Sequence, residues 1–206
     1  MTKLILIRHG QTVWNHELRY QGQTDVALTE EGYRQARLMT NRLKTEKIDA
    51  IYASDLSRAL ETAKIVAEGW SVSVQSLPEL REINFGVWEG LTYKEIAERY
   101  PDLVKVWFSN PSQVRIPNGE MFAELQDRAY GAIKSLLAKH PDQTILVASH
   151  GATIRMIICG ILGMELDRAW QIRQDNTAVN IIDFYDGQGI IRVLNDIHHL
   201  GDDGSG

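Results

Sequence analysis

The sequence predicts an α/β protein: a three-layer α/β/α sandwich with a mostly parallel sheet and an antiparallel edge strand. Two observations lead to this class. Strand-like and helix-like segments alternate along the first 70 residues, as in chains that join parallel strands by crossover helices. The apolar runs Leu4–Ile7 and Thr144–Ala148 contain no alternating polar positions, which is typical of strands buried on both faces of a parallel sheet.

The first half of the chain supplies its elements in this order. Residues 3–8 are expected to form a central strand. Thr29 is an N-cap residue followed by two glutamates, and apolar residues then recur at helical spacing to Leu43, which predicts a helix of about four turns. The other elements expected before residue 76 are a strand over 48–53, a helix over 56–68 and a short strand over 72–75.

Residues 78–118 differ from the rest because four prolines interrupt a stretch rich in aromatic side chains. Short helices and loops are expected there. Loops on a rigid sheet commonly supply specificity, so we interpret this segment as a small cap that faces the substrate. A secondary hydrophobic cluster built from the same aromatic residues is the alternative.

The last third of the chain returns to longer elements, and a closing β-hairpin joined by residues 186–189 would supply the antiparallel edge. We expect one domain over residues 1–200, with 201–206 as a flexible tail without function. The elements expected here are a helix over 119–140, a strand over 144–149, a buried helix over 152–162 that stops at Gly163, and strands over 178–185 and 190–194.

Composition and charge exclude several classes of function. Lys and Arg number 22 against 27 Asp and Glu, and the formal net charge of −5 comes without a long basic block, so neither nucleic acid nor an anionic membrane is an expected partner. The apolar runs are too short to span a bilayer, and the first 15 residues lack the pattern of a secretory signal. A cytoplasmic protein is therefore expected. Cys159 is the only cysteine, so no internal disulfide can form.

Reactive side chains follow four of the expected strands. In an open α/β sheet the functional crevice lies outside the carboxyl ends of the strands, so these side chains are expected to meet in one pocket. They are Arg8 and His9 after the first strand, Arg58 after the second, Glu82 after the third and His150 after the fourth.

Two arginines and two histidines favour an oxyanion as the ligand of this pocket. A planar guanidinium group donates paired hydrogen bonds to a phosphoryl group or a carboxylate. His150 and Gly151 precede an expected helix, whose free amides add an anion-binding contribution. With so many donors a transferring phosphoryl group can be stabilised without a metal ion. The sequence therefore predicts no metal site and no cofactor.

Other phosphate chemistries lack their motifs in this sequence. It contains no Gly-x-x-x-x-Gly-Lys nucleotide loop, no Gly-x-Ser-x-Gly elbow and no His-Glu-x-x-His pair. Gly187 and Gly189 fail as a dinucleotide fingerprint because Arg192 stands where the third glycine belongs. Cys159 has Glu165 at the position where a cysteine phosphatase carries arginine.

The ordered motifs resemble those of the histidine phosphatase superfamily, also called the phosphoglycerate mutase-like family, over nearly the whole chain. The signature Leu-Ile-Arg-His-Gly-Gln-Thr-Val-Trp-Asn occupies residues 6–15. The resemblance implies that family's fold, with residues 78–118 as a small cap insertion. The further matching motifs are Gln21-Gly22, Leu28-Thr29-Glu-Glu-Gly32, Ser54-Asp-Leu-Ser-Arg58, Leu80-Arg-Glu82 and Ser149-His150-Gly151.

The resemblance also implies a role for each reactive residue. His9 would be the nucleophile that becomes a phosphohistidine, and Glu82 the acid that protonates the leaving alkoxide and then activates water. Relatives carry a similar His-Leu near the carboxyl end, which makes His199 a candidate lining residue. The phosphoryl oxygens would be held by Arg8, Arg58 and His150, with further substrate contacts from Asn15, Gln21, Gly22 and Gly151.

These roles predict a metal-independent phosphomonoesterase that hydrolyses small phosphorylated metabolites, with broad specificity as the first interpretation. The chain is also similar to α-ribazole phosphatases and metal-independent phosphoserine phosphatases, but phosphoserine-specific relatives tend to carry a histidine where this chain has Phe85. Phosphoglycerate mutase is a further alternative, although mutases are usually longer between the acid and the second histidine. An inactive module that binds a phosphorylated partner is the alternative from another class. The sequence leaves the oligomeric state open, a homodimer included.

Overall fold

The computed structural model describes residues 1–201, so residues 202–206 of the expected tail lie outside the described part of the chain. A six-stranded sheet with the order β3-β2-β4-β1-β5-β6 forms the middle layer. Strands β1 to β4 run parallel, and β5 and β6 pair antiparallel at one edge. The predicted fold class is thereby confirmed. The strands are β1 (Thr2–Arg8), β2 (Ala50–Ala53), β3 (Val74–Ser76), β4 (Thr144–Ser149), β5 (Val179–Tyr185) and β6 (Gln188–Asp196).

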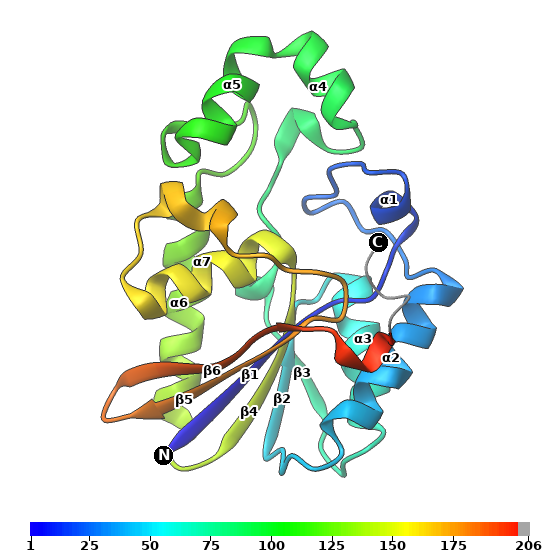
Figure 1. Ribbon diagram of the computed structural model, residues 1–206, viewed down its shortest axis with the longest axis vertical. Coiled ribbons are helices and arrows are strands. Elements are labelled where there is room, and N and C mark those ends of the chain that lie inside the picture. Colours follow the sequence, from blue (N-terminus) through cyan, green and yellow to red (C-terminus); the bar gives the residue numbers. More distant parts are fainter. Residues whose placement is uncertain (202–206) are drawn as a thin grey trace.

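Helices cover both faces of this sheet (Figure 1). They are α2 (Glu30–Leu43), α3 (Ser57–Ala67), α6 (Phe122–Lys139) and α7 (Gly151–Leu162). The apolar side chains of α2 and α3 pack in one cluster with Ile5 and Ile7 of β1, and those of α6 and α7 pack in another with Leu4 and Leu6. Because successive residues of a strand point to opposite faces, one uninterrupted apolar strand serves both helical layers.

The ends of the elements follow signals in the sequence. The Thr29 side chain caps α2 by accepting a hydrogen bond from the backbone N–H of Gly32, and α7 stops at Gly163, whose φ of 63° is a left-handed conformation that suits glycine. The β5–β6 turn is tighter than expected. Asp186 and Gly187 both have positive φ, as a two-residue hairpin turn requires, so β6 begins at Gln188 rather than at residue 190.

Short elements that the sequence pattern did not predict lie between the expected ones. They are α1 (Val13–His16) and 3₁₀ turns at Leu166–Gln171 and His198–Leu200. These elements have only three to six residues, too few for a periodic apolar repeat, so sequence periodicity cannot detect them.

Residues 78–118 lie beyond the carboxyl ends of the parallel strands (Figure 1). The segment contains α4 (Tyr93–Arg99), α5 (Pro101–Ser109) and 3₁₀ turns at Pro78–Leu80, Gly86–Trp88 and Pro111–Gln113. Trp107 is the centre of an aromatic cluster, because the ring centroids of Trp88, Phe122 and Trp170 lie 5.5, 4.8 and 5.4 Å from its own. Trp88 and Trp107 are buried, so these two side chains pack the segment onto the body of the protein.

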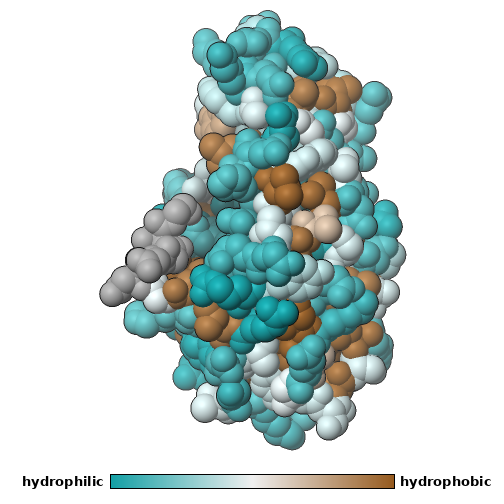
Figure 2. Space-filling view, turned by 90° about the vertical axis from the view of Figure 1, so that its right-hand side faces the viewer, coloured by the Kyte–Doolittle hydropathy of each residue, from teal (hydrophilic) through white to brown (hydrophobic). Residues whose placement is uncertain are grey.

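On the face shown in Figure 2, hydrophilic residues predominate and apolar residues occur in small groups. Scattered apolar side chains of this kind are normal on a protein surface. Within residues 1–201, none of the helices combines the length and the apolar character that crossing a membrane requires.

Candidate active site

The carboxyl ends of the parallel strands open into one pocket with a cavity volume of about 250 Å³. Seven residues that the sequence predicts for the site line it: Arg8, His9, Asn15, Gln21, Gly22, Arg58 and Glu82. The rest of the lining comes from Leu18, Arg19, Tyr20 and Phe85. His150 lies against His9, with the two ring centroids 5.1 Å apart. The four strand ends therefore place their reactive side chains together.

His9 is held in the form that a nucleophile needs. Its Nδ1 lies 2.7 Å from the carbonyl oxygen of Gly10. A carbonyl only accepts hydrogen bonds, so Nδ1 carries the proton and Nε2 keeps its lone pair. Burial, together with the nearby guanidinium groups of Arg58 and Arg8, holds the pKa of His9 well below its usual range. The imidazole is therefore neutral at neutral pH and its Nε2 is available for attack.

His150 is fully buried at the N-terminus of α7. Neither of its ring nitrogens has a hydrogen-bond partner among the described residues. Burial and the charge of Arg58 hold the pKa of His150 well below its usual range. Buried polar atoms rarely remain unpaired, so this ring is placed to bond a ligand. Gly151 follows it, and a Cβ there would lie 3.3 Å from Nη1 of Arg155 and 3.5 Å from Nε of Arg8.

Arg8 is oriented by a buried amide pair. Its Nη1 donates to the carbonyl oxygen of Gln174 at 2.6 Å, and the Gln174 side chain exchanges two hydrogen bonds of 2.9 Å with the side chain of Asn180 on β5. Burial and repulsion from Arg155 lower the pKa of Arg8 to about 10, so the group stays charged at neutral pH. Its Nε is buried without a partner among the described residues and is free for an anion.

Arg58 lies in the first turn of α3 and is entirely buried. Its Nη1 and Nη2 donate to the carbonyls of Thr24 and Gly22 at 2.9 and 2.7 Å. Burial lowers the pKa of Arg58 to about 10, so it is the second cation of the site at neutral pH. A buried arginine without a carboxylate partner is costly unless an anionic ligand neutralises it.

The loop that accepts these bonds is held by Glu89. Its Oε1 accepts from the backbone N–H of Gln23 and its Oε2 from that of Thr24, both at 2.9 Å. Gly22 has a φ of 54°, and a Cβ there would lie 2.0 Å from Glu89 Oε1. Glycine is therefore required for this close approach, and both oxygens of Glu89 already accept hydrogen bonds from backbone N–H groups.

The two carboxylate oxygens of Glu82 differ in their hydrogen bonds. Oε1 accepts from the backbone N–H groups of Ile83 and Thr153 at 3.0 and 3.1 Å. The Thr153 hydroxyl donates to the carbonyl of Arg81 at 2.8 Å and lies 3.1 Å from Oε1. Oε2 accepts one hydrogen bond, from the N–H of Ala152 at 3.1 Å. A carboxylate oxygen has two lone pairs, so Oε2 keeps one for a proton. The backbone N–H groups of Ala152 and Thr153, at the N-terminus of α7, thus hold the carboxylate in place.

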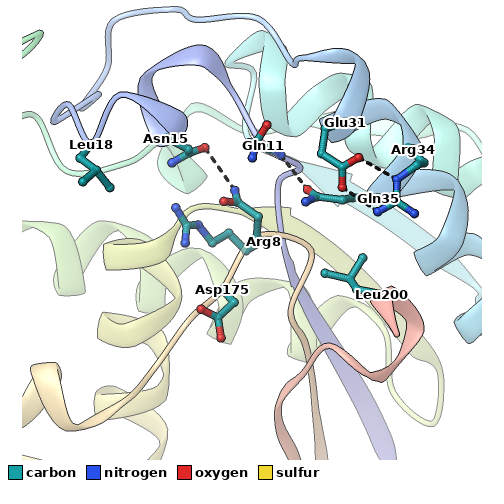
Figure 3. A pocket seen from close by; sticks show the side chains of 10 residues that line it. Arg8, Gln11, Asn15, Leu18, Glu31, Arg34, Gln35, Asp175 and Leu200 are labelled. Atoms are coloured by element: carbon teal, nitrogen blue, oxygen red, sulfur yellow. Dashed lines mark hydrogen bonds and ion pairs between the residues drawn. The ribbon is translucent and has the colours of Figure 1, made fainter. Parts of the chain in front are cut away.

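Asn15 lies at the edge of the pocket and is bonded to two neighbouring segments of the protein. Its Oδ1 accepts from the backbone N–H of Thr12 and from Nδ2 of Asn176, and the same Nδ2 also donates to the carbonyl of His9. A second pocket of about 380 Å³ shares Arg8, Asn15 and Leu18 with the first. Figure 3 shows Gln11, Gln35 and the ion pair of Glu31 with Arg34 on its far side. This outer space is lined mostly by polar side chains and adjoins the first pocket at the three shared residues.

Several residues that support the site were missed by sequence reasoning. Gln174 and Asn176 lie in a segment without periodic pattern, so no signal marked them. Thr153 and Arg155 do carry a signal, because both are polar residues inside a helix that is otherwise apolar on nearly every side. Arg155 donates through Nε to the carbonyl of Ile172 and lies over the ring of Trp170. In the described part of the chain, no group of three or more His, Cys, Asp or Glu is arranged to hold a metal ion.

His199 does not line either pocket beside Arg8. Its Nε2 lies 3.1 Å from the hydroxyl of Thr177, and the backbone N–H of Thr177 donates to the carbonyl of His9 at 3.3 Å. His199 therefore connects the carboxyl-terminal 3₁₀ turn to the segment that contacts the backbone of His9. Burial lowers the pKa of His199 to about 4.

The lowered pKa of His199 predicts a pH-dependent stability. The unfolded chain binds a proton on this ring near pH 6.5 but the folded chain only near pH 4, so folding loses stability progressively as pH falls from about 6.5 to about 4. His199→Gln should flatten this part of the curve. The measurement is chemical denaturation of both proteins at pH 7.5, 5.5 and 4.5, and equal slopes for the two would refute the expectation.

The comparisons with known proteins agree with this geometry. A model of the histidine phosphatase superfamily (branch 1) matches residues 4–197. The chain belongs to the histidine phosphatase superfamily. The resemblance inferred from the motifs is thus confirmed.

Individual members of the superfamily match over nearly the full length of the chain. Phosphoserine phosphatase 1 of Hydrogenobacter thermophilus is 35% identical over 98% of this chain and 96% of its own. The metal-independent phosphoserine phosphatase of Arabidopsis thaliana is 36% identical over 97% and 84%. The solved structure of Bacillus stearothermophilus YhfR superposes with a TM-score of 0.92 at 35% identity, covering 97% of this chain and all of that one. Other matches are named as phosphoglycerate mutase-like protein and α-ribazole phosphatase.

Proposed function

We propose that this protein is a metal-independent phosphomonoesterase that hydrolyses small phosphorylated metabolites through a phosphohistidine at His9. The observation that carries the proposal is the neutral imidazole of His9, with Nε2 free, beside the cations Arg8 and Arg58. Two positive groups neutralise the phosphoryl oxygens, and a neutral nitrogen can attack phosphorus. The names of the relatives as phosphatases, one of them metal-independent, support the same reaction class.

In the first step Nε2 of His9 attacks phosphorus while the ester P–O bond breaks. The proton on Oε2 of Glu82 passes to the departing alkoxide, which leaves as an alcohol. Arg8, Arg58 and His150 hold the phosphoryl oxygens, and their donors stabilise the charge that builds up on them. The product is a phosphohistidine and an ionised Glu82.

In the second step the ionised Glu82 accepts a proton from a water molecule as that water attacks phosphorus. The N–P bond breaks, its electron pair returns to Nε2, and inorganic phosphate leaves. Glu82 is protonated again, and the enzyme is ready for another substrate. The carbonyl of Gly10 keeps the Nδ1 proton in place throughout.

The rim that meets the leaving group favours broad specificity. Tyr20 and Phe85 pack edge to face with ring centroids 5.0 Å apart, and Leu18 adds a further apolar surface. Arg19 also lines the pocket, but its guanidinium is already bonded to Glu17 and to a backbone carbonyl. An apolar rim discriminates weakly between leaving groups, by roughly 10–200-fold for a difference of one methylene.

Phosphoserine is the specific substrate with the most support, because two relatives are named for it and one neighbouring structure, from Entamoeba histolytica, is described with phosphoserine bound. The cytoplasmic location and the possible homodimer expected from the sequence remain predictions alongside this proposal.

The test is phosphate release in excess chelator. The purified protein is given an aryl phosphate, phosphoserine, α-ribazole 5′-phosphate, a sugar phosphate and 3-phosphoglycerate, with the His9→Ala variant as background. Broad specificity predicts values of kcat/KM that lie within about a hundredfold of one another. Isomerisation of 3-phosphoglycerate without phosphate release would instead identify a mutase. Release that stops with the chelator, or that equals the background on every ester, would overturn the proposal.

A further inference from the structure

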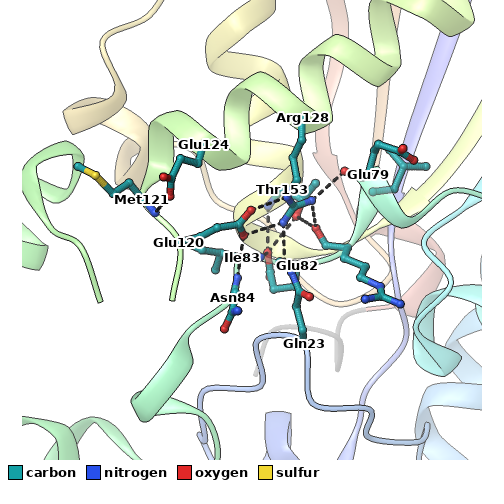
Figure 4. Close-up of polar contacts among 12 residues, drawn as sticks. Gln23, Glu79, Glu82, Ile83, Asn84, Glu120, Met121, Glu124, Arg128 and Thr153 are labelled. Carbon is teal, nitrogen blue, oxygen red and sulfur yellow. Dashed lines mark hydrogen bonds and ion pairs between the residues drawn. The ribbon is translucent and has the colours of Figure 1, made fainter. Parts of the chain in front are cut away.

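Arg128 of α6 is bonded to the segment that contains Glu82, although the two residues are 46 positions apart in the sequence (Figure 4). Its guanidinium donates to the carbonyls of Glu79, Arg81 and Glu82, each at 2.8 Å. Nε and Nη2 also donate to the carboxylate of Glu120 at 2.6 and 2.9 Å. All five N–H groups of the guanidinium therefore donate hydrogen bonds, which fixes the position and the plane of the group.

Glu120 extends this contact to the residue beyond Ile83. Its Oε2 accepts from the backbone N–H of Asn84 at 2.9 Å, and its own N–H donates to the carbonyl of Asn84 at 2.8 Å. The side chains of Arg128 and Glu120 are only 21% and 19% exposed. A largely shielded pair with paired hydrogen bonds holds its geometry better than an exposed ion pair does. Together the two residues bind backbone on both sides of Glu82.

Both the backbone and the carboxylate of Glu82 are therefore held by hydrogen bonds. The Arg128–Glu120 pair fixes its backbone, and the N-terminus of α7 fixes its carboxylate through Ala152 and Thr153. An acid that must deliver a proton to a leaving oxygen depends on such placement, since a misplacement of about 1 Å can cost about a hundredfold in rate. The Arg128 side chain is not among the residues that line the reaction pocket, so any effect it has on the chemistry acts through Glu82.

We propose that Arg128, oriented by Glu120, is a positioning residue that places Glu82 for proton transfer to the leaving group. The inference rests on the proposed phosphatase function and deepens it. A positioning role differs from a merely structural one in a measurable way. If Arg128 positions Glu82, the activity lost on replacing Arg128 depends on how much the leaving group needs a proton. An alkoxide needs one, whereas a dinitrophenolate leaves readily without it.

The experiment compares kcat/KM of Arg128→Met on two esters, glycerol 2-phosphate and 2,4-dinitrophenyl phosphate, because kcat/KM reports the steps up to loss of the leaving group. The expected result is a fall of about 10–100-fold on the alkyl ester and of less than about threefold on the dinitrophenyl ester. Arg128→Lys keeps the charge but has fewer donors, so it should recover part of the loss on the alkyl ester alone.

Arg115→Met is the matched control. Arg115 also pairs with a glutamate at the start of α6, Glu124, but its side chain is 57% exposed. Among the described residues its guanidinium has no hydrogen bond to the segment 79–84, so the variant should be as active as the wild type on both esters. Thermal unfolding checks that each variant is folded, and Glu120→Gln replaces Arg128→Met if the latter is not. Equal losses on the two esters, or no loss on either, would overturn the inference. A wild-type protein inactive on both esters would instead refute the proposed function.

Discussion

Replacing His9 with alanine is expected to lower kcat by roughly 10⁴-fold or more, because the variant has no group that can accept the phosphoryl group covalently. Phosphate binding should persist. The cationic donors Arg8 and Arg58 are held by backbone carbonyls of Gln174, Gly22 and Thr24, none of which depends on the imidazole. Steady-state release of phosphate from an aryl phosphate measures turnover, and calorimetric titration with inorganic phosphate measures binding.

His16→Ala is the matched control, since that histidine is exposed and seven positions further along the chain. It should retain full activity. A His9→Ala protein that is folded, binds phosphate and still turns over at a rate near that of the wild type would show that another group is the nucleophile.

Replacing Glu82 with glutamine is expected to lower kcat/KM on an alkyl phosphate by about 10²–10⁴-fold, the usual contribution of a positioned acid or base. Glutamine has nearly the same shape but cannot give up a proton to the alkoxide. Because Glu82 meets α7 through Ala152 and Thr153 rather than through a phosphate-binding arginine, inhibition by inorganic phosphate should change by less than about threefold.

Glu79→Gln serves as the comparison for this variant. Glu79 lies three residues earlier, its side chain is exposed, and it does not line the pocket. Full activity is expected from it. If the two variants lost activity equally, or if Glu82→Gln lost phosphate affinity as severely as turnover, the assignment of Glu82 as the acid would be wrong.

The position of the reactive residues could be predicted from the sequence because parallel strands share one edge. Once the apolar runs before His9 and His150 are recognised as parallel strands, the topology itself brings the two histidines together. Glu79 and Glu89 are close to Glu82 in the sequence, so spacing alone does not identify which of the three is the acid. The family resemblance chose it, and the structure engages Glu89 with the loop that holds Arg58.

The supporting contacts could not be predicted in the same way. In the sequence, Arg128 resembles any polar residue of an amphipathic helix. Its three hydrogen bonds to backbone carbonyls arise only because α6 packs against the Glu82 segment. The side chains of Gln174 and Asn180 on β5 bond to each other, but no sequence motif marks this pair. Such contacts depend on side-chain direction and on long-range packing, which periodicity and propensity do not encode.

The account depends most directly on a covalent bond between phosphorus and Nε2 of His9. Rapid mixing of the protein with a ³²P-labelled aryl phosphate, followed by quenching in alkali, tests it, because phosphohistidine survives alkali. We expect label on the protein within one turnover, located by peptide mapping at His9 and absent from His9→Ala. Steady turnover with no label at any time of quenching, or label on another residue, would contradict the mechanism.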